Sequence, residues 1–135
     1  MVLGVDEVGR GCLAGPVVAG AVLLGKTIPG LADSKKLTRL QREKLDVVIR
    51  RRAKTFGIGW VSPQELDELG LTAAVRLAMQ RAVAEINVPY DKLVIDGNYN
   101  FLPDMPGSQC IVKADALVPA VSAASIIAKV ARDAY

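Results

Sequence analysis

Residues 2–24 of this chain read VLGVDEVGRGCLAGPVVAGAVLL, two apolar segments separated by a glycine-rich one. The first segment ends in the adjacent acids Asp6 and Glu7, and its residue types favour a central strand. The glycines that follow indicate a loop or tight turn, and the valines of residues 16–24 are typical of a buried strand. Two strands with a short loop between them predict an antiparallel hairpin rather than a crossover through a helix.

The rest of the chain alternates predicted helices and strands. Thr38 with Gln41, and Ser62 with Glu65, each fit a capping box, the side-chain arrangement that begins many helices. Helices are predicted after residue 38, after residue 62, across 71–86 and across 118–133, and further strands at 55–61, 92–95 and 110–112. This alternation predicts an α/β fold with a mixed sheet.

Composition excludes several kinds of protein. The 135 residues carry a net charge of +3, 51% of them are hydrophobic, and none is histidine. A chain of this length and apolar content can form one domain with a buried core and is not a disordered chain. The missing histidine excludes a Ser-His-Asp triad, a Cys-His dyad, a His-zinc site and a histidine general base. Carboxylates, lysine or a metal held by oxygen ligands must then carry any chemistry.

The cysteines and the apolar segments indicate the cytoplasm. Cys12 and Cys110 form no close-spaced pair, and we interpret them as reduced thiols that fill space. No secretory signal is evident, and the apolar run at residues 17–24 is too short to cross a membrane.

Acidic residues end two of the predicted strands. Asp6 and Glu7 end the first strand, and Asp96 ends the strand at residues 92–95. Open α/β sheets place their sites at the carboxyl ends of strands. Converging carboxylates repel one another unless cations neutralise them, and Mg²⁺ and Mn²⁺ prefer oxygen ligands. Two such ions about 3.5–4 Å apart would suit in-line attack on a phosphodiester.

Simpler interpretations of these acids stay open. An acid at the end of a strand can merely cap a turn, and Asp115 alone is no more than an acid flanking a helix. Alternation along a strand sends Asp6 and Glu7 to opposite faces, so both serve one site only if the strand ends or bends there.

The glycine loop and the basic stretch after it suit a phosphate-bearing ligand. Gly9, Arg10 and Gly11 offer backbone N–H groups and a guanidinium to a sugar-phosphate. A dinucleotide-binding fingerprint fits poorly, because Gly15 comes one residue late and a strand follows it. Basic residues are dense from Lys35 to residue 54, which indicates either a phosphate-binding surface or a solvated helix face.

Four blocks of the sequence resemble the ribonuclease HII family, in the family's order. They are GVDEVGRGCLAGPV at residues 4–17, DSKKL at 33–37, VIDG at 94–97 and SAASIIAKVARD at 122–133. The resemblance implies a ribonuclease H-like fold, a mixed sheet flanked by helices. It also implies an endonuclease that hydrolyses the RNA strand of RNA/DNA hybrids and incises duplex DNA at embedded ribonucleotides, leaving 5′-phosphate and 3′-hydroxyl ends.

The resemblance also assigns roles to residues at matching positions. The implied ligands of two Mg²⁺ or Mn²⁺ ions are Asp6, Glu7, Asp96 and Asp115. One ion would activate the attacking water, and the other would stabilise the leaving 3′ oxygen. Substrate contacts are implied for Gly9, Arg10 and Gly11, which would read the ribose 2′-hydroxyl, and for Lys35, Ser122, Ser125 and Lys129 on the backbone. We expect a monomer that binds nucleic acid and no membrane.

The end of the sequence departs from the family pattern. The family continues past its last block into a segment with a tyrosine that packs on the junction sugar, and Tyr135 does not match that motif. We therefore expect residues 1–135 to be a ribonuclease H-like catalytic core whose C-terminal segment is missing. The alternative function is a hybrid-binding fragment without catalysis.

Overall fold

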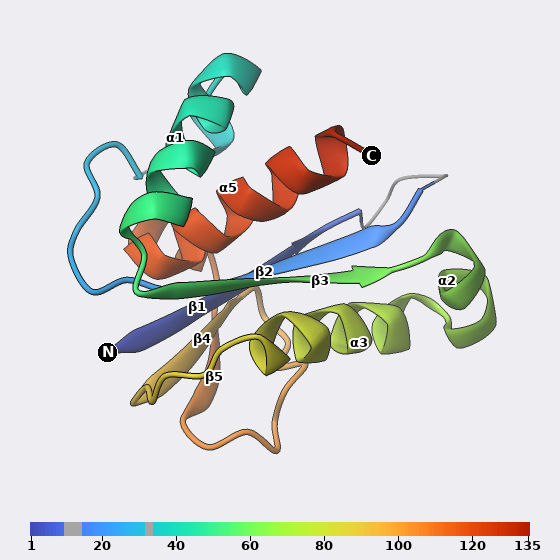
Figure 1. Cartoon of the computed structure of the whole chain (residues 1–135). Helices are drawn as coiled ribbons and strands as arrows, with labels where there is room; N and C mark the ends of the chain where they lie inside the picture. The colour runs from blue at the N-terminus through green and yellow to red at the C-terminus, as the bar shows by residue number, and fades with distance from the viewer. Residues whose placement is uncertain (10–14, 32–33) are drawn as a thin grey trace.

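A mixed sheet forms the centre of the molecule. The computed structural model describes residues 1–9, 15–31 and 34–135, and the predicted site residues Arg10 and Gly11 lie outside these ranges. The sheet has five strands in the order β3-β2-β1-β4-β5 (Figure 1). Its strands are β1 (Val2–Val8), β2 (Val17–Leu23), β3 (Thr55–Val61), β4 (Lys92–Asp96) and β5 (Ser108–Ile111). The helical elements are η1 (Ser34–Lys36), α1 (Arg39–Arg52), α2 (Pro63–Leu69), α3 (Leu71–Ala84), α4 (Ala114–Leu117) and α5 (Pro119–Asp133).

Strand directions bring the predicted acidic ends together. β1 runs antiparallel to β2, as the hairpin prediction requires, and β2 runs antiparallel to β3. β1 is parallel to β4, with Val5 opposite Ile95, and β4 is parallel to β5. Because parallel strands end at the same edge, Asp6 and Asp96 lie side by side at one end of the sheet. The predicted mixed α/β class is confirmed.

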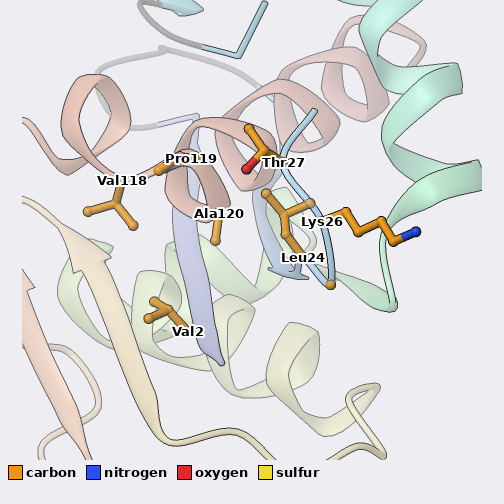
Figure 2. A pocket seen from close by; sticks show the side chains of 8 residues that line it. Val2, Leu24, Lys26, Thr27, Val118, Pro119 and Ala120 are labelled. Carbon is orange, nitrogen blue, oxygen red and sulfur yellow. The ribbon is translucent and has the colours of Figure 1, made fainter. Parts of the chain in front are cut away.

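Glycines in the sheet allow α5 to pack very close to it. A Cβ at Gly4 would lie 2.2 Å from the backbone carbonyl carbon of Ala120, and one at Gly20 would lie 2.3 Å from the Ala124 oxygen. In the same region Val2 lines a shallow cavity with the first turn of α5 (Figure 2). Strand alternation puts Asp6 on the same face of β1 as Gly4, so Asp6 lies on the face that α5 covers.

The opposite face of the sheet carries the larger hydrophobic cluster. Leu3 and Val5 of β1 are fully buried there against Ala78 and Met79 of α3 and their neighbours. Full burial of an aliphatic side chain contributes about 1.5–3 kcal/mol, so this cluster supplies much of the stability that holds the edge with the acids in place.

The predicted helices and strands are all present with their bounds within two residues, and the structure adds two short helices. Both capping boxes, at Thr38 and Ser62, are present. β5 begins at Ser108 rather than residue 110, because its pairing with β4 and not its apolar composition sets its start. η1 and α4 lie where no helix was predicted, and such short helices are too brief to show a helical period. Among the described helices none is both long and apolar enough to cross a bilayer.

Candidate active site

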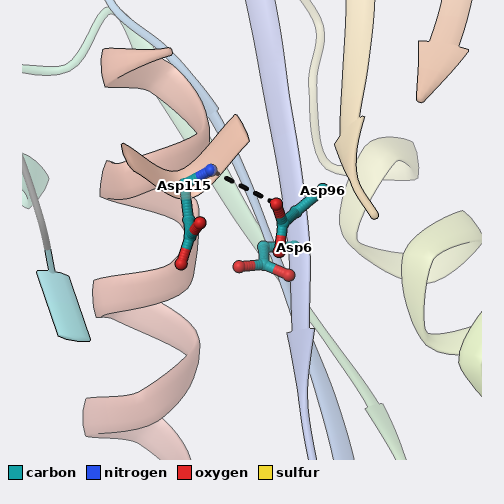
Figure 3. A group of neighbouring side chains, drawn as sticks. All are labelled: Asp6, Asp96 and Asp115. Carbon is teal, nitrogen blue, oxygen red and sulfur yellow. Dashed lines mark hydrogen bonds between the residues drawn. The ribbon is translucent and has the colours of Figure 1, made fainter. Parts of the chain in front are cut away.

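Three aspartates converge at the carboxyl ends of β1 and β4. One carboxylate oxygen from each of Asp6, Asp96 and Asp115 lies within 4.8 Å of the other two (Figure 3). The parallel pairing of β1 with β4 brings the first two together. Asp115 lies on α4, which follows β5, and β5 ends at the same edge because it is parallel to β4. We call these three residues the carboxylate cluster.

The cluster holds Asp6 in an environment that opposes its negative charge. Asp6 is 7% exposed, and its pKa is raised well above the ordinary value of 3.8. Burial is the largest cause, and the charges of Glu7, Asp96 and Asp115 add to it. The backbone N–H of Glu7 donates to Oδ1 of Asp6 at 2.8 Å and only partly offsets these effects. An added cation would relieve this repulsion.

The described protein groups around the cluster compensate its charge incompletely. The backbone N–H of Asp115 donates to Oδ1 of Asp96 at a long 3.3 Å (Figure 3). Nζ of Lys35 lies 3.6 Å from Oδ2 of Asp115, although the lysine side chain is 68% exposed. Oδ1 of Asp115 is buried and has no hydrogen-bond partner among the described residues. A donor set made only of oxygen, with a buried oxygen left over, fits a hard divalent cation such as Mg²⁺ or Mn²⁺.

Glu7 is the predicted ligand that the structure does not bring into the cluster. β1 continues through Val8, and Glu7 pairs with Ala19, so the strand does not end between the two acids. Alternation then puts Glu7 on the face opposite Asp6. Its charge still raises the pKa of Asp6. The role of Glu7 as a metal ligand stays a prediction.

The predicted substrate contacts fall into two groups. Lys35, in η1, reaches the carboxylate cluster through Asp115. Ser122 and Ser125 are buried on α5, and the Ser122 hydroxyl donates to the carbonyl of Leu31, while Lys129 is half-buried on the same helix. Gly9 is described, with a positive φ of 112° that favours glycine. Contact of all these residues with nucleic acid stays a prediction.

Arg132 is a residue near the site that sequence reasoning missed. Its Nε donates to the carbonyl of Pro16 at 3.0 Å. A Cβ at Gly15 would lie 2.8 Å from Nη2 of Arg132, and a Cβ at Gly9 would lie 3.3 Å from its Nε. Arg132 therefore packs against residues on both sides of the segment 10–14. The arginine stands in the last family block, but nothing in its spacing indicates partners more than 100 residues earlier.

A mixed sheet flanked by helices, with acids gathered at the ends of two parallel strands, defines the class of ribonuclease H-like nucleases. Sequence comparison gives the family within this class. The ribonuclease HII family model matches residues 3–135. Ribonuclease HII of Laribacter hongkongensis (strain HLHK9) is 50% identical, over 98% of this chain and 69% of the relative. That of Francisella philomiragia is 48% identical, over 98% of this chain and 72% of the relative. The chain belongs to the ribonuclease HII family, whose members are enzymes that cut RNA.

Solved structures agree with this assignment. Ribonuclease H2 from Pyrococcus horikoshii OT3 matches with a TM-score of 0.86 and 33% identity, over 98% of this chain and 72% of that one. Ribonuclease HII from Archaeoglobus fulgidus, solved as a complex with PCNA, matches with a TM-score of 0.81 and 32% identity, over 99% and 72%. Bst-RNase HIII in complex with Mn²⁺ shares the fold at 21% identity and a TM-score of 0.77, over 98% and 52%.

Proposed function

We propose that this chain is the catalytic core of a ribonuclease HII. It hydrolyses the RNA strand of RNA/DNA hybrids and incises duplex DNA at embedded ribonucleotides, leaving 5′-phosphate and 3′-hydroxyl ends. One observation carries the proposal: Asp6, Asp96 and Asp115 converge within 4.8 Å at one sheet edge in a member of this family.

The carboxylate cluster is the proposed metal site. Asp6, Asp96 and Asp115 hold the ions, and Glu7 is a fourth ligand on the strength of the family resemblance. Two Mg²⁺ or Mn²⁺ ions held there would supply activation of the attacking water and stabilisation of the leaving 3′ oxygen. The protein's part is to keep negatively charged oxygens close together, which the raised pKa of Asp6 reflects. Two parallel strands and α4 hold these oxygens before substrate arrives.

Residues beside the cluster orient the nucleic acid. The ammonium of Lys35, 3.6 Å from Asp115, can also attract a phosphate at the cluster. Gly9, with Arg10 and Gly11, reads the ribose 2′-hydroxyl, the group that separates RNA from DNA. The remaining proposed contacts to the phosphate backbone are Ser122, Ser125 and Lys129. We keep the prediction that the protein acts as a cytoplasmic monomer.

A cleavage assay tests the proposal. The substrates are a labelled RNA/DNA hybrid and a labelled DNA duplex with one ribonucleotide, each incubated with the parent chain or Asp6→Asn and with Mg²⁺ or Mn²⁺. We expect incision by the parent, ends that carry 5′-phosphate and 3′-hydroxyl, and no product from the variant. Equal cleavage by both proteins would contradict the site. Retarded migration of the substrate without cleavage would favour the alternative of a hybrid-binding fragment.

A further inference from the structure

A basic pocket lies near the end of the sheet opposite the carboxylate cluster. Its volume is about 600 Å³, and its lining residues are Gly25, Lys26, Thr27, Ile28, Arg52 and Lys54. The pocket therefore has cations but no acid in its wall. None of Lys26, Arg52 and Lys54 forms an ion pair with a carboxylate among the described residues. We call these three residues the cation triplet.

The fold brings the cation triplet together from separate elements. Lys26 follows β2, Arg52 ends α1, and Lys54 precedes β3. The backbone N–H of Lys54 donates to the carbonyl of Leu23 at 2.9 Å and ties the α1–β3 turn to the end of β2. A cation in the last turn of a helix interacts favourably with the helix dipole, and this accounts for the position of Arg52. It does not explain the two lysines, which lie outside the helix.

The neighbouring Arg50 shows what a structural cation looks like in the same place. Its Nε lies 3.0 Å from Oδ1 of Asp46, and its guanidinium lies over the Phe56 ring at 5.3 Å from the ring centroid. Arg50 is thus paired with groups of the protein, although it is exposed. The cation triplet is also exposed but makes none of the ion pairs that the structure describes, so its charge is available to an outside anion.

A second cavity adjoins the basic pocket at the same end of the sheet. It has a volume of about 250 Å³ and shares Gly25, Lys26 and Thr27 with the basic pocket. It extends to Val118 and Ala120, directly after α4, the helix that carries Asp115 (Figure 2). The hollowed surface therefore runs from the first turn of α5 to the cations.

We propose that the cation triplet binds the phosphate backbone of the nucleic-acid duplex at a distance from the cut. This inference rests on the proposed function. Lys26 lines both cavities, and Val2, which lines the smaller one, is four residues from Asp6 on β1, so this end of the strand lies about 13 Å from the cluster. With about 3.4 Å of duplex for each base pair, that is about four base pairs. Cations spread over an open pocket suit a polyanion, whose many weak contacts add up, better than a single small phosphate.

Two matched double variants test the inference in binding measurements without divalent ions. Lys26→Gln with Lys54→Gln removes two charges from the triplet, while Lys44→Gln with Lys92→Gln removes two exposed lysine charges that do not line the basic pocket. Affinity for a 20-base-pair hybrid is measured against salt concentration, and again for a series of hybrids shortened from either end. Thermal unfolding checks that all variants fold, and a parallel titration uses inorganic phosphate.

The triplet variant should bind the long hybrid roughly tenfold or more weakly at 0.1 M salt, and its log–log salt slope should be shallower by about 2. The control variant should lose less, and the difference between variants should vanish once the duplex is too short to reach the pocket. Equal losses in both variants, or loss of phosphate binding with hybrid binding unchanged, would overturn the inference. If the parent binds and cleaves a hybrid but the triplet variant behaves like it, only this inference fails. If the parent neither binds nor cleaves, the proposed function fails with it.

Discussion

The carboxylates of Glu65 and Asp6 have pKa values shifted in opposite directions by their surroundings. At the corner of α2 and α3, both oxygens of Glu65 accept from Arg81, at 3.0 and 2.8 Å, and the Ser62 backbone N–H donates to Oε1 at 3.0 Å. The pKa of Glu65 is lowered to about 2, whereas that of Asp6 is raised well above its ordinary value. Glu65 has its partners within the chain and serves the fold. Asp6 has too few such partners to offset the effects of burial and of the neighbouring negative charges.

The largest expected effect is a loss of cleavage rate when the charge of Asp6 is removed from the carboxylate cluster. Asp6→Asn keeps the side-chain shape and the oxygen that accepts from Glu7, but it removes a charged ligand. We expect cleavage of a hybrid under single-turnover conditions with Mg²⁺ to slow by roughly a thousandfold or more. Glu65→Gln is the matched control, and its rate should stay within about twofold of the parent rate. Similar losses in the two variants would mean that the cluster has no special role.

The second prediction compares the arginines that serve the two regions. Arg132→Gln should raise KM for the hybrid roughly tenfold with little change in kcat. The variant loses the charged hydrogen bond that holds Pro16, directly after Gly15, and a bond of this kind contributes about 1.5–3 kcal/mol. Arg132→Lys should recover part of the affinity. Arg81→Gln should lower Tm and leave KM unchanged. A fall in kcat alone for Arg132→Gln would contradict a positioning role.

The third prediction concerns stability against pH in metal-free protein. Because the folded-state pKa of Asp6 is raised, the native state binds more protons than the unfolded state between pH 3.8 and that pKa. Stability therefore falls as pH rises through this window, and Asp6→Asn removes the fall. We expect the variant to have the higher Tm at neutral pH and the same Tm as the parent near pH 4. A lower Tm for the variant at neutral pH would show that the charge is well compensated.

The smallest expected effect concerns Glu65. Its lowered pKa stabilises the folded state above the ordinary value of 4.5, and this contribution is lost as pH falls toward about 2. Glu65→Gln should thus lower Tm slightly at neutral pH, with a smaller difference at pH 3 and in high salt, since the pair is exposed and screened. Thermal scans at both pH values measure this, and a salt-independent loss would point to the α2 cap instead of the charge.

Local sequence signals predicted the sheet core and part of the site. The valine-rich hairpin and the capping boxes at Thr38 and Ser62 are encoded within a few residues, so they could be predicted. Asp6 and Asp96 could be placed together because acids at the ends of buried strands meet at one edge of a sheet. In these regions the local sequence pattern and the tertiary contacts favour the same secondary structure and the same position for each side chain.

Other features depend on contacts between distant residues. Asp115 joined the predicted site only through the family resemblance, because α4 has four residues and no periodicity of its own. The partners of Arg132 flank the connection between β1 and β2, more than 100 residues earlier in the chain, and the cation triplet meets only because β2 pairs with β3. Glu7 is a further case: the unbroken register of β1 gives it the strand position opposite in face to Asp6, and its role as a metal ligand stays a prediction from the family resemblance.

The most direct test of the carboxylate cluster is a measurement of Mn²⁺ affinity. Calorimetric titration gives this affinity for the metal-free parent and for metal-free Asp96→Asn. Asp96 contributes an oxygen to the cluster but is not fully buried, so its replacement should leave the fold intact. If the three aspartates hold the metal, the parent binds Mn²⁺ and the variant binds it at least about tenfold more weakly. Equal Mn²⁺ affinity in the two proteins would contradict the assignment of these residues as the metal site.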